Sequence, residues 1–286
     1  MITSTPLDYY NQEAENYKAM YMPNYEKYPA NLIRLKMMTK ILKKSKKKTV
    51  LDAGCGSATP MIRLIKSGFD VNGFDYSKGM VKYGQNELKS HNLSPNLIYH
   101  ADLTKFSTMK KKKFDAVIAL GVFPHIKNER AALKNIKKCL KKNGSVYIEF
   151  RNRLLSLFSQ NKFSADFYLN DLINTKKIPK KMITELIKFY SKKLSVGKNV
   201  KTKDGRIIYS DIYAKFRNPF TIERELFEPI GFKVNDFHFY HYHALPPIFE
   251  TTHKDIFRKL SKKIENPSDW RGHFLCSAFV VEASIN

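Results

Sequence analysis

A short apolar run followed at once by two glycines constrains this chain more than any other stretch. The run Thr49–Leu51 carries β-branched side chains and predicts a buried strand, and residues 61–66 predict the opening of a helix. Gly54 and Gly56 lie in the turn between them. Because glycine lacks a Cβ, the backbone there can turn sharply and a ligand can lie against it. The stretch therefore predicts a strand, loop and helix that bind a nucleotide.

The loop departs from the pattern that binds dinucleotides. That pattern carries a third glycine for close packing of helix on strand, and here the position is Thr59. The loop also begins with Asp52, whose carboxylate would repel a pyrophosphate and suits a cationic ligand. The sequence therefore favours a nucleotide that carries positive charge.

Several later strands end in acidic residues. The predicted strands that follow cover residues 70–77, 97–103, 114–121 and 144–150. Asp75 lies near the end of the first of these, where a carboxylate accepts hydrogen bonds from ribose hydroxyls in nucleotide-binding folds. Asp102 ends the next, and a lysine-rich helix over residues 130–142 precedes the last. Strands and helices in alternation predict an α/β fold.

These motifs resemble, in order, those of the class I S-adenosylmethionine (SAM) methyltransferases. The string VLDAGCGSAT at residues 50–59 is similar to the first motif of the family, and residues 74–80 and 114–117 are similar to later ones. The resemblance implies SAM as cofactor and S-adenosylhomocysteine as product. It also implies a seven-stranded, doubly wound methyltransferase sheet in the order 3-2-1-4-5-7-6, with the seventh strand antiparallel beside the fifth.

The resemblance implies a set of cofactor-binding residues. Asp75 would bind the ribose, Asp102 the adenine amino group, and Leu103 would lie beside the ring. Tyr17 is the candidate for a tyrosine that covers the methionine end, since a sulfonium is attracted to a π-face, or it covers apolar surface instead. The candidate cofactor-binding residues are Tyr17, Asp52, Ala53, Gly54, Gly56, Asp75, Tyr76, Met80, Asp102, Leu103 and Leu120.

We expect the chain to have four parts, of which the SAM-binding half is the second. We expect an N-terminal helical cover (1–48), the SAM-binding half (49–152), an inserted lid over the acceptor site (153–218) and the C-terminal part of the core sheet (219–286). Within the lid the sequence predicts helices over residues 164–174 and 180–195 and a hairpin near 203–206. A lid of this kind would exclude water and shape the acceptor pocket.

Histidines supply the candidate general bases. His125 follows the fourth strand, where an imidazole would act as a base or pack on the next helix. Strand alternation predicts His241 and His243 on one face, and Tyr240 and Tyr242 on the other. Plain strand packing is the alternative for these residues. No cysteine or acid lies at metal-ligand spacing from them, so we expect no metal.

Residues at the end of the fifth strand are candidates to bind the acceptor. Arg151 presents a rigid fork to an acidic group, or pairs with Glu149 at the surface. Asn152 and Tyr242 complete the candidate acceptor-binding set. Residues 149–163 are similar to a subset of the family associated with surface-glycan and small-metabolite modification. We therefore expect a small polar acceptor such as a sugar hydroxyl.

The net charge of +25 is almost all lysine, with runs at Lys43–Lys48, Lys110–Lys113 and Lys137–Lys142. These runs fall at loops opposite the carboxyl ends of the strands, where ligands bind, which favours a solvated surface. An RNA or protein methyltransferase recruited by this surface is the alternative, as is a non-catalytic SAM-binding subunit.

Neither the cysteines nor the apolar segments indicate export or a membrane span. Cys55, Cys139 and Cys276 are scattered and give no disulfide framework. No run approaches the roughly twenty apolar residues of a membrane span. No signal peptide is visible. We expect a reduced, cytoplasmic protein.

Overall fold

A computed structural model describes residues 10, 17–23, 25, 28–173, 175–194 and 214–285. Its centre is one sheet in the order β3-β2-β1-β4-β5-β8-β7, with β6 paired beside β5. The strands are β1 (Thr49–Ala53), β2 (Asp70–Asp75), β3 (Ile98–His100), β4 (Phe114–Ala119), β5 (Leu140–Asn152), β6 (Phe216–Arg217), β7 (Phe232–Tyr242) and β8 (Cys276–Ile285). The predicted strand order is confirmed, and the two-residue strand β6 is added to it.

The strand directions bring distant carboxyl ends to one edge of the sheet. Strands β1 to β5 pair in parallel, whereas β8 runs antiparallel between β5 and β7. Because β5 and β7 both oppose β8, their carboxyl ends lie at the same edge as those of β1, β2 and β4. In open sheets of this kind ligands bind at that edge.

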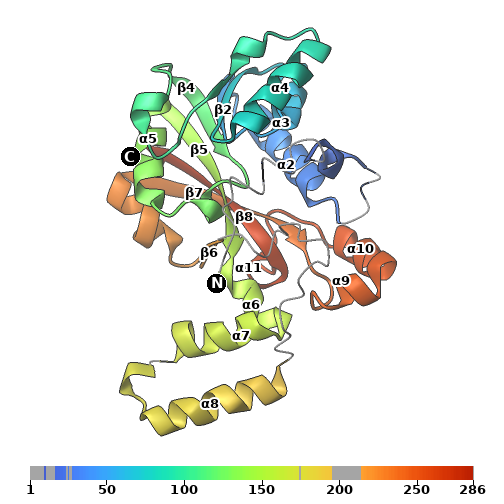
Figure 1. The fold of residues 1–286 in the computed structure, drawn as a ribbon, viewed down its shortest axis with the longest axis vertical. Helices are drawn as coiled ribbons and strands as arrows, with labels where there is room; N and C mark the ends of the chain where they lie inside the picture. Colours follow the sequence, from blue (N-terminus) through green and yellow to red (C-terminus); the bar gives the residue numbers. More distant parts are fainter. Residues whose placement is uncertain are drawn as a thin grey trace.

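Helices cover both faces of the sheet, as Figure 1 shows. One hydrophobic cluster joins the sheet to α2 (Ala30–Lys44), α3 (Thr59–Lys66) and α4 (Lys78–Ser90). A second joins it to α5 (Glu129–Cys139), η9 (Glu223–Phe227) and η10 (Glu228–Ile230). The sheet is therefore buried on both faces, which explains the nearly continuous apolar runs of its parallel strands.

The fifth strand begins earlier than the sequence predicted. Helix α5 ends at Cys139 rather than continuing to residue 142, and β5 starts at Leu140. Leu140 is buried and pairs with Phe114, and the register then shifts before Ala116. Leu140 therefore belongs to the strand, although lysines lie on both sides of it. Its burial against the sheet is a tertiary effect that a lysine-rich sequence does not reveal.

The segment after β5 projects from the body of the molecule (Figure 1). It contains α6 (Ser156–Ser159), α7 (Lys162–Phe167) and α8 (Lys180–Lys193), so the predicted helices are present. Arg153 fixes its base by pairing with Asp166 at 2.6 Å and lying 5.4 Å from the Phe167 ring. The hairpin predicted near 203–206 lies outside the described residues, and a covering role for the lid stays a prediction.

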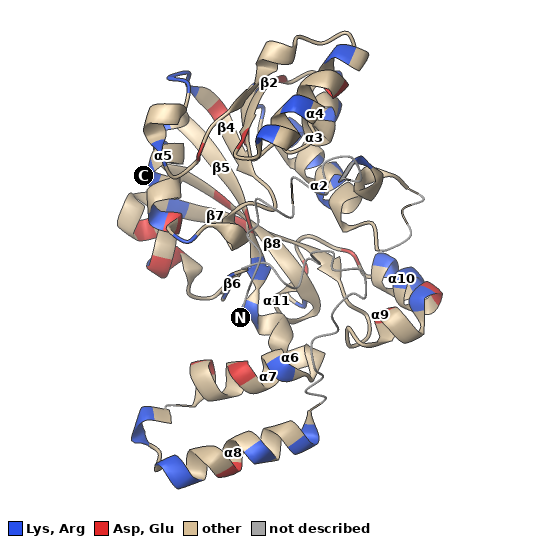
Figure 2. Ribbon diagram, in the orientation of Figure 1, with Lys and Arg blue, Asp and Glu red and all other residues tan. Residues whose placement is uncertain are grey.

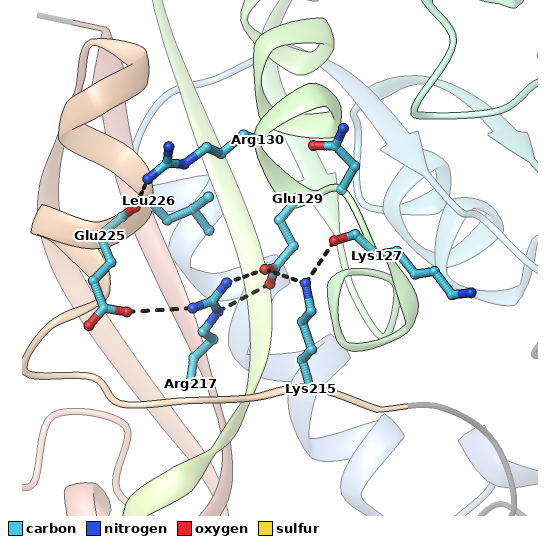
Figure 3. Close-up of a pocket in the computed structure, with 8 residues that line it drawn as sticks. Lys127, Glu129, Arg130, Lys215, Arg217, Glu225 and Leu226 are labelled. Carbon is cyan, nitrogen blue, oxygen red and sulfur yellow. Dashed lines mark hydrogen bonds and ion pairs between the residues drawn. The ribbon is translucent and has the colours of Figure 1, made fainter. Parts of the chain in front are cut away.

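The return from this segment is anchored on α5, as Figure 3 shows. Glu129, at the start of α5, is 3% exposed and pairs with Lys215 and Arg217. Arg217 also approaches Glu225 at 3.5 Å, and β6 pairs with the end of β5. A buried carboxylate requires such partners, since burying it alone would be costly. The anchor places residues 214–218 next to the carboxyl edge of the sheet.

A second insertion lies between β7 and β8. It carries α9 (Phe249–Thr252) and α10 (Lys254–Lys263), and α11 (Gly272–Leu275) then leads into β8. None of the described helices combines the length and apolar character that a bilayer crossing requires.

Phe150 tests the central packing. Its ring lies 5.5 Å from that of Phe123 and 5.9 Å from that of Phe279. We expect Phe150→Ala to lower the free energy of unfolding by about 3–5 kcal/mol in urea denaturation, because the cavity left in the core cannot collapse fully. Phe189→Ala on the exposed side of α8 is the control and should change it by less than about 0.5 kcal/mol. Equal effects would contradict this description of the core.

Candidate active site

The glycine loop after β1 is held against the neighbouring strand. The backbone N–H groups of Gly54 and Cys55 donate to Phe74 O at 2.8 and 3.0 Å. Gly54 has a φ of 88°, and a Cβ there would meet Val122 Cγ2 at 2.3 Å. Only glycine therefore satisfies both the conformation and the space at this position.

Asp75, at the end of β2, connects this loop to helix α4. Its carboxylate accepts hydrogen bonds from Gly56 N at 2.9 Å and Ser77 N at 2.8 Å. Ser77 in turn caps α4 by accepting from Met80 N. Burial raises the pKa of Asp75 and these hydrogen bonds lower it, with a net rise. Asp75 thus sets the relative position of the glycine loop and the start of α4.

A cavity of about 720 Å³ opens at the carboxyl edge between β1, β2, β3 and β4. Its lining includes most of the residues that the sequence predicted to contact the cofactor. These are Gly54, Gly56, Asp75, Tyr76, Met80, Asp102, Leu103 and Leu120, and His125 joins them. Ala53 and Asp52 lie directly behind the lining in β1. The structure therefore brings these residues together, and their contacts with a cofactor stay a prediction.

Asp102 lies at the far side of this cavity from the glycine loop. One of its oxygens accepts from Thr104 N at 2.8 Å and from Thr104 Oγ1 at 2.7 Å. The other lies 3.8 Å from Lys105 Nζ. Leu103 is buried beside it, so an apolar wall and a polar acceptor adjoin each other here.

A buried cluster of charges lies beside the cavity, and sequence reasoning missed its cation. Arg34 of α2 pairs with Glu149 of β5 and donates to Tyr21 Oη at 3.2 Å. Its guanidinium also lies beside Gly121, which lines the cavity. The signal available in the sequence was an arginine within the mostly apolar residues 32–38 of the expected N-terminal helical cover.

Asp52 completes this cluster. It is 3% exposed, and within the described part of the chain its Oδ2 has no hydrogen-bond partner. Burial raises the pKa of Asp52 to about 7; Arg34 opposes the rise and Asp75 adds to it. A buried carboxylate oxygen without a partner suits a ligand that brings a hydrogen-bond donor or positive charge.

A tyrosine does reach the cavity from the N-terminal segment. Tyr10 lines the cavity, and its hydroxyl lies 3.2 Å from His125 Nε2. Tyr17 begins the short helix η1 (Tyr17–Tyr21), but its side chain lies outside the described part of the structure. The predicted covering role of Tyr17 stays a prediction.

His241 and His243 lie beyond the cavity, at the carboxyl end of β7. His241 stacks on Tyr28 at 4.8 Å and on His243 at 4.9 Å. Burial lowers the pKa of His243 to about 4, with Arg151 adding to the effect. Burial, His243 and Arg151 lower the pKa of His241 well below its usual range. Both imidazoles are therefore neutral near pH 7. No group of three or more His, Cys, Asp or Glu in the described ranges is placed to hold a metal.

The predicted alternation at the end of β7 is wrong for the two tyrosines, although the rings of His241 and His243 do lie together. Phe239 and Tyr242 belong to one hydrophobic cluster, whereas Tyr240 belongs to the other. His241 has a φ of 60°, in the left-handed region, so regular alternation stops there.

Two of the residues predicted to bind the acceptor are buried in structural contacts. Asn152 is 1% exposed and donates to His273 O and Cys276 O at 2.8 Å each, which fixes α11. The Tyr242 hydroxyl donates to Asn266 O at 2.6 Å. Arg151 is half-buried and lies near His241 and His243. The assignment of Asn152 and Tyr242 to the acceptor is corrected, because backbone carbonyls occupy their polar groups.

Comparison with known proteins identifies the class. A family model described as a methyltransferase domain matches residues 44–186, half of the chain. The chain belongs to this family, the class I SAM-dependent methyltransferases.

Individual relatives match part of the chain. It is 25% identical over 140 residues to a ubiquinone biosynthesis O-methyltransferase of Coxiella burnetii, covering 49% of this chain and 58% of that one. It is 34% identical over 134 residues to a glycine/sarcosine N-methyltransferase of Aphanothece halophytica, covering 45% and 50%. The chain thus spans about half the length of the curated relatives it matches.

The fold has a counterpart among solved structures. Magnesium protoporphyrin IX methyltransferase from Synechocystis, with bound S-adenosylhomocysteine, matches at a TM-score of 0.57 and 15% identity. The match covers 98% of this chain and 97% of that one. At this identity the similarity shows the fold.

Asn152→Ala tests the structural role of Asn152. We expect the free energy of unfolding to fall by about 2–4 kcal/mol, because buried carbonyl groups lose their donor. Urea denaturation would measure this loss. Asn143→Ala, at an exposed position of β5, is the control and should have little effect. A fully stable Asn152→Ala protein would contradict the structural role.

The raised pKa of Asp52 predicts a dependence of stability on pH. The folded protein holds this proton up to about pH 7, whereas an unfolded aspartate releases it near pH 4. The free energy of unfolding should therefore fall as the pH rises between these values, by up to about 1.4 kcal/mol per pH unit. Asp52→Asn should remove this component in urea denaturation at pH 5 and 7.5. The same pH dependence in both proteins would show that Asp52 does not titrate in this range.

Proposed function

We propose that this chain is a methyltransferase that binds SAM in the carboxyl-edge cavity and methylates a small polar acceptor, releasing S-adenosylhomocysteine. One observation carries the proposal. The glycine loop, Asp75 and Asp102 lie in sequence order around a single cavity of about 720 Å³. This is the arrangement that a nucleoside with a charged tail requires.

The two halves of the cavity suit the two halves of the cofactor. Asp75 is placed to accept hydrogen bonds from a ribose, and Asp102 and Leu103 offer a polar and an apolar contact to adenine. Behind the lining, Asp52 and Arg34 belong to a buried cluster whose charges complement the ammonium and the carboxylate of the methionine part. The residues present therefore fit SAM, which supplies an electrophilic methyl group on a cationic sulfur.

The chain's own contribution is to position the acceptor and to remove its proton. An acceptor hydroxyl or ammonium must lose a proton, and His125 lines the cavity with its Nε2 3.2 Å from the Tyr10 hydroxyl. Alignment of the acceptor in this space lowers the barrier by several kcal/mol. His125 is accordingly the base we favour, because the rings of His241 and His243 are not part of the cavity lining.

The names of two relatives support a small-molecule acceptor. One is an O-methyltransferase of ubiquinone biosynthesis and the other an N-methyltransferase of glycine and sarcosine. We propose the hydroxyl group of a sugar or related metabolite as the first class to test. Amines such as glycine form the second arm of the same screen.

Calorimetric titration of SAM and S-adenosylhomocysteine, with NAD as control, tests the cofactor. Transfer of radiolabelled methyl groups to sugars and amines then tests turnover. Binding of SAM without transfer to any member of a broad panel would favour a non-catalytic subunit. Binding of NAD and not of SAM would overturn the proposal.

Asp75→Ala should weaken SAM binding roughly 10- to 100-fold, since hydrogen bonds to a charged group contribute about 1.5–3 kcal/mol. Asp70→Ala at the opposite end of β2 is the matched control and should leave the affinity unchanged. Thermal unfolding would show whether both variants keep the fold. Unchanged SAM affinity in folded Asp75→Ala protein would exclude the ribose assignment.

A further inference from the structure

Three lysine runs that are far apart in the sequence meet at the amino edge of the sheet. They are Lys43–Lys48 at the end of α2, Lys110–Lys113 before β4 and Lys137–Lys142 across the junction of α5 and β5, and we call them the lysine face. Lys47 Nζ donates to Asn143 O at 2.6 Å, which joins the first run to the third. Lys141 pairs with Asp115 of β4 at 2.9 Å. Figure 2 shows lysines and arginines at the loops of this edge.

Asp115 links the first of these runs to the third. Its carboxylate accepts hydrogen bonds from Thr49 N at 2.9 Å and Lys48 N at 3.3 Å, in addition to the pair with Lys141. Burial would raise the pKa of Asp115, and these hydrogen bonds outweigh it, so the pKa lies below its usual range. This carboxylate therefore already makes hydrogen bonds and an ion pair within the protein.

The lysine face keeps a large excess of positive charge. In the ranges that the structure describes, the ion pairs to its lysines come from Asp115 and from Asp70, which pairs with Lys112 at 3.4 Å. Most of the remaining amines are exposed. Helix dipoles favour lysines at the ends of α2 and α5, but this does not apply to Lys110–Lys113 in a loop. Repulsion among these amines would be relieved by a polyanion.

The amino-acid composition of the lysine face indicates which kind of polyanion it would bind. The large apolar side chains that are exposed in the described ranges lie elsewhere, on the lid, on α9 and α10 and at Trp270 among other places. Protein interfaces are depleted in lysine and have apolar centres, and membrane-surface helices insert apolar side chains. A phosphodiester backbone requires only positive charge. The runs contain no arginine, the residue best suited to reading guanine edges.

We propose that the lysine face binds nucleic acid through its phosphates, without reading sequence or distinguishing RNA from DNA. The face lies at the edge opposite the cavity, so the bound strand is not the methyl acceptor. The contact holds the protein on nucleic acid while the carboxyl edge stays open. This inference does not depend on the proposed methyl transfer.

Fluorescence anisotropy with labelled single-stranded RNA and DNA of mixed sequence, in 50–200 mM salt, tests the proposal. The variant carries Lys43→Gln, Lys44→Gln, Lys111→Gln and Lys142→Gln, which are exposed residues from all three runs. The control carries Lys180→Gln, Lys181→Gln, Lys192→Gln and Lys193→Gln in α8, with the same loss of charge.

We expect binding by the native chain that weakens steeply with salt. The face variant should lose at least tenfold in affinity, and its salt slope should become shallower by about 3, since each phosphate contact on a single strand contributes about 0.7. The α8 control should stay within about twofold of the native chain. RNA and DNA should behave alike.

Three results would overturn the proposal. Equal losses in both variants would show that only net charge matters. No binding of either strand at 50 mM salt would exclude the site. Binding to vesicles of phosphatidylglycerol that depends on the same lysines, without binding to nucleic acid, would assign the face to lipid. SAM titration into the face variant should match the native chain, which separates this test from that of the cavity.

Discussion

The buried pairing of Arg34 with Glu149 is the interaction on which the rest of the site depends. It joins α2, which precedes the sheet, to the centre of β5, and both side chains are almost fully buried. Taking two charges out of water is costly, and replacing such a pair with apolar residues often raises stability. The pair therefore makes better sense as part of the site than as a source of stability. It fixes a cation near Asp52 and beside Gly121, which lines the cavity.

The two edges of the sheet have opposite chemistry for one geometric reason. Parallel strands bring all their carboxyl ends to one edge and their amino ends to the other. At the carboxyl edge, turns with glycine and short acidic residues leave backbone groups and carboxylates facing a cavity. At the amino edge, the connections return from helices whose last turns carry lysine. The polarity of the sheet thus separates a small-ligand site from a broad basic surface.

Both insertions, after β5 and after β7, begin at the carboxyl edge of the sheet. The lid leaves from the end of β5 and returns through β6, which pairs with that same end. The ion pairs of Glu129 with Lys215 and Arg217 then tie the return to the start of α5. A long insertion is tolerated because its two ends are held close together, so the core need not change. The second insertion likewise leaves from the carboxyl end of β7, and Tyr28 Oη donates to Glu265 within it.

The sequence by itself, through its resemblance to a family, determined the expected strand order and part of the cavity lining. Glycines at 54 and 56 and acids at 52, 75 and 102 report on local backbone needs and strand ends, and such signals survive without tertiary information. Tertiary structure alone decided the roles of Arg34, Asn152 and His241. Each of these roles depends on partners far away in the chain. The guanidinium of Arg34 is buried against β5, the amide of Asn152 binds backbone carbonyls at α11, and the left-handed φ of His241 interrupts the strand alternation. The sequence did place the three lysine runs at one edge of the sheet, but contacts between them, such as that of Lys47 Nζ with Asn143 O, appear only in the tertiary structure.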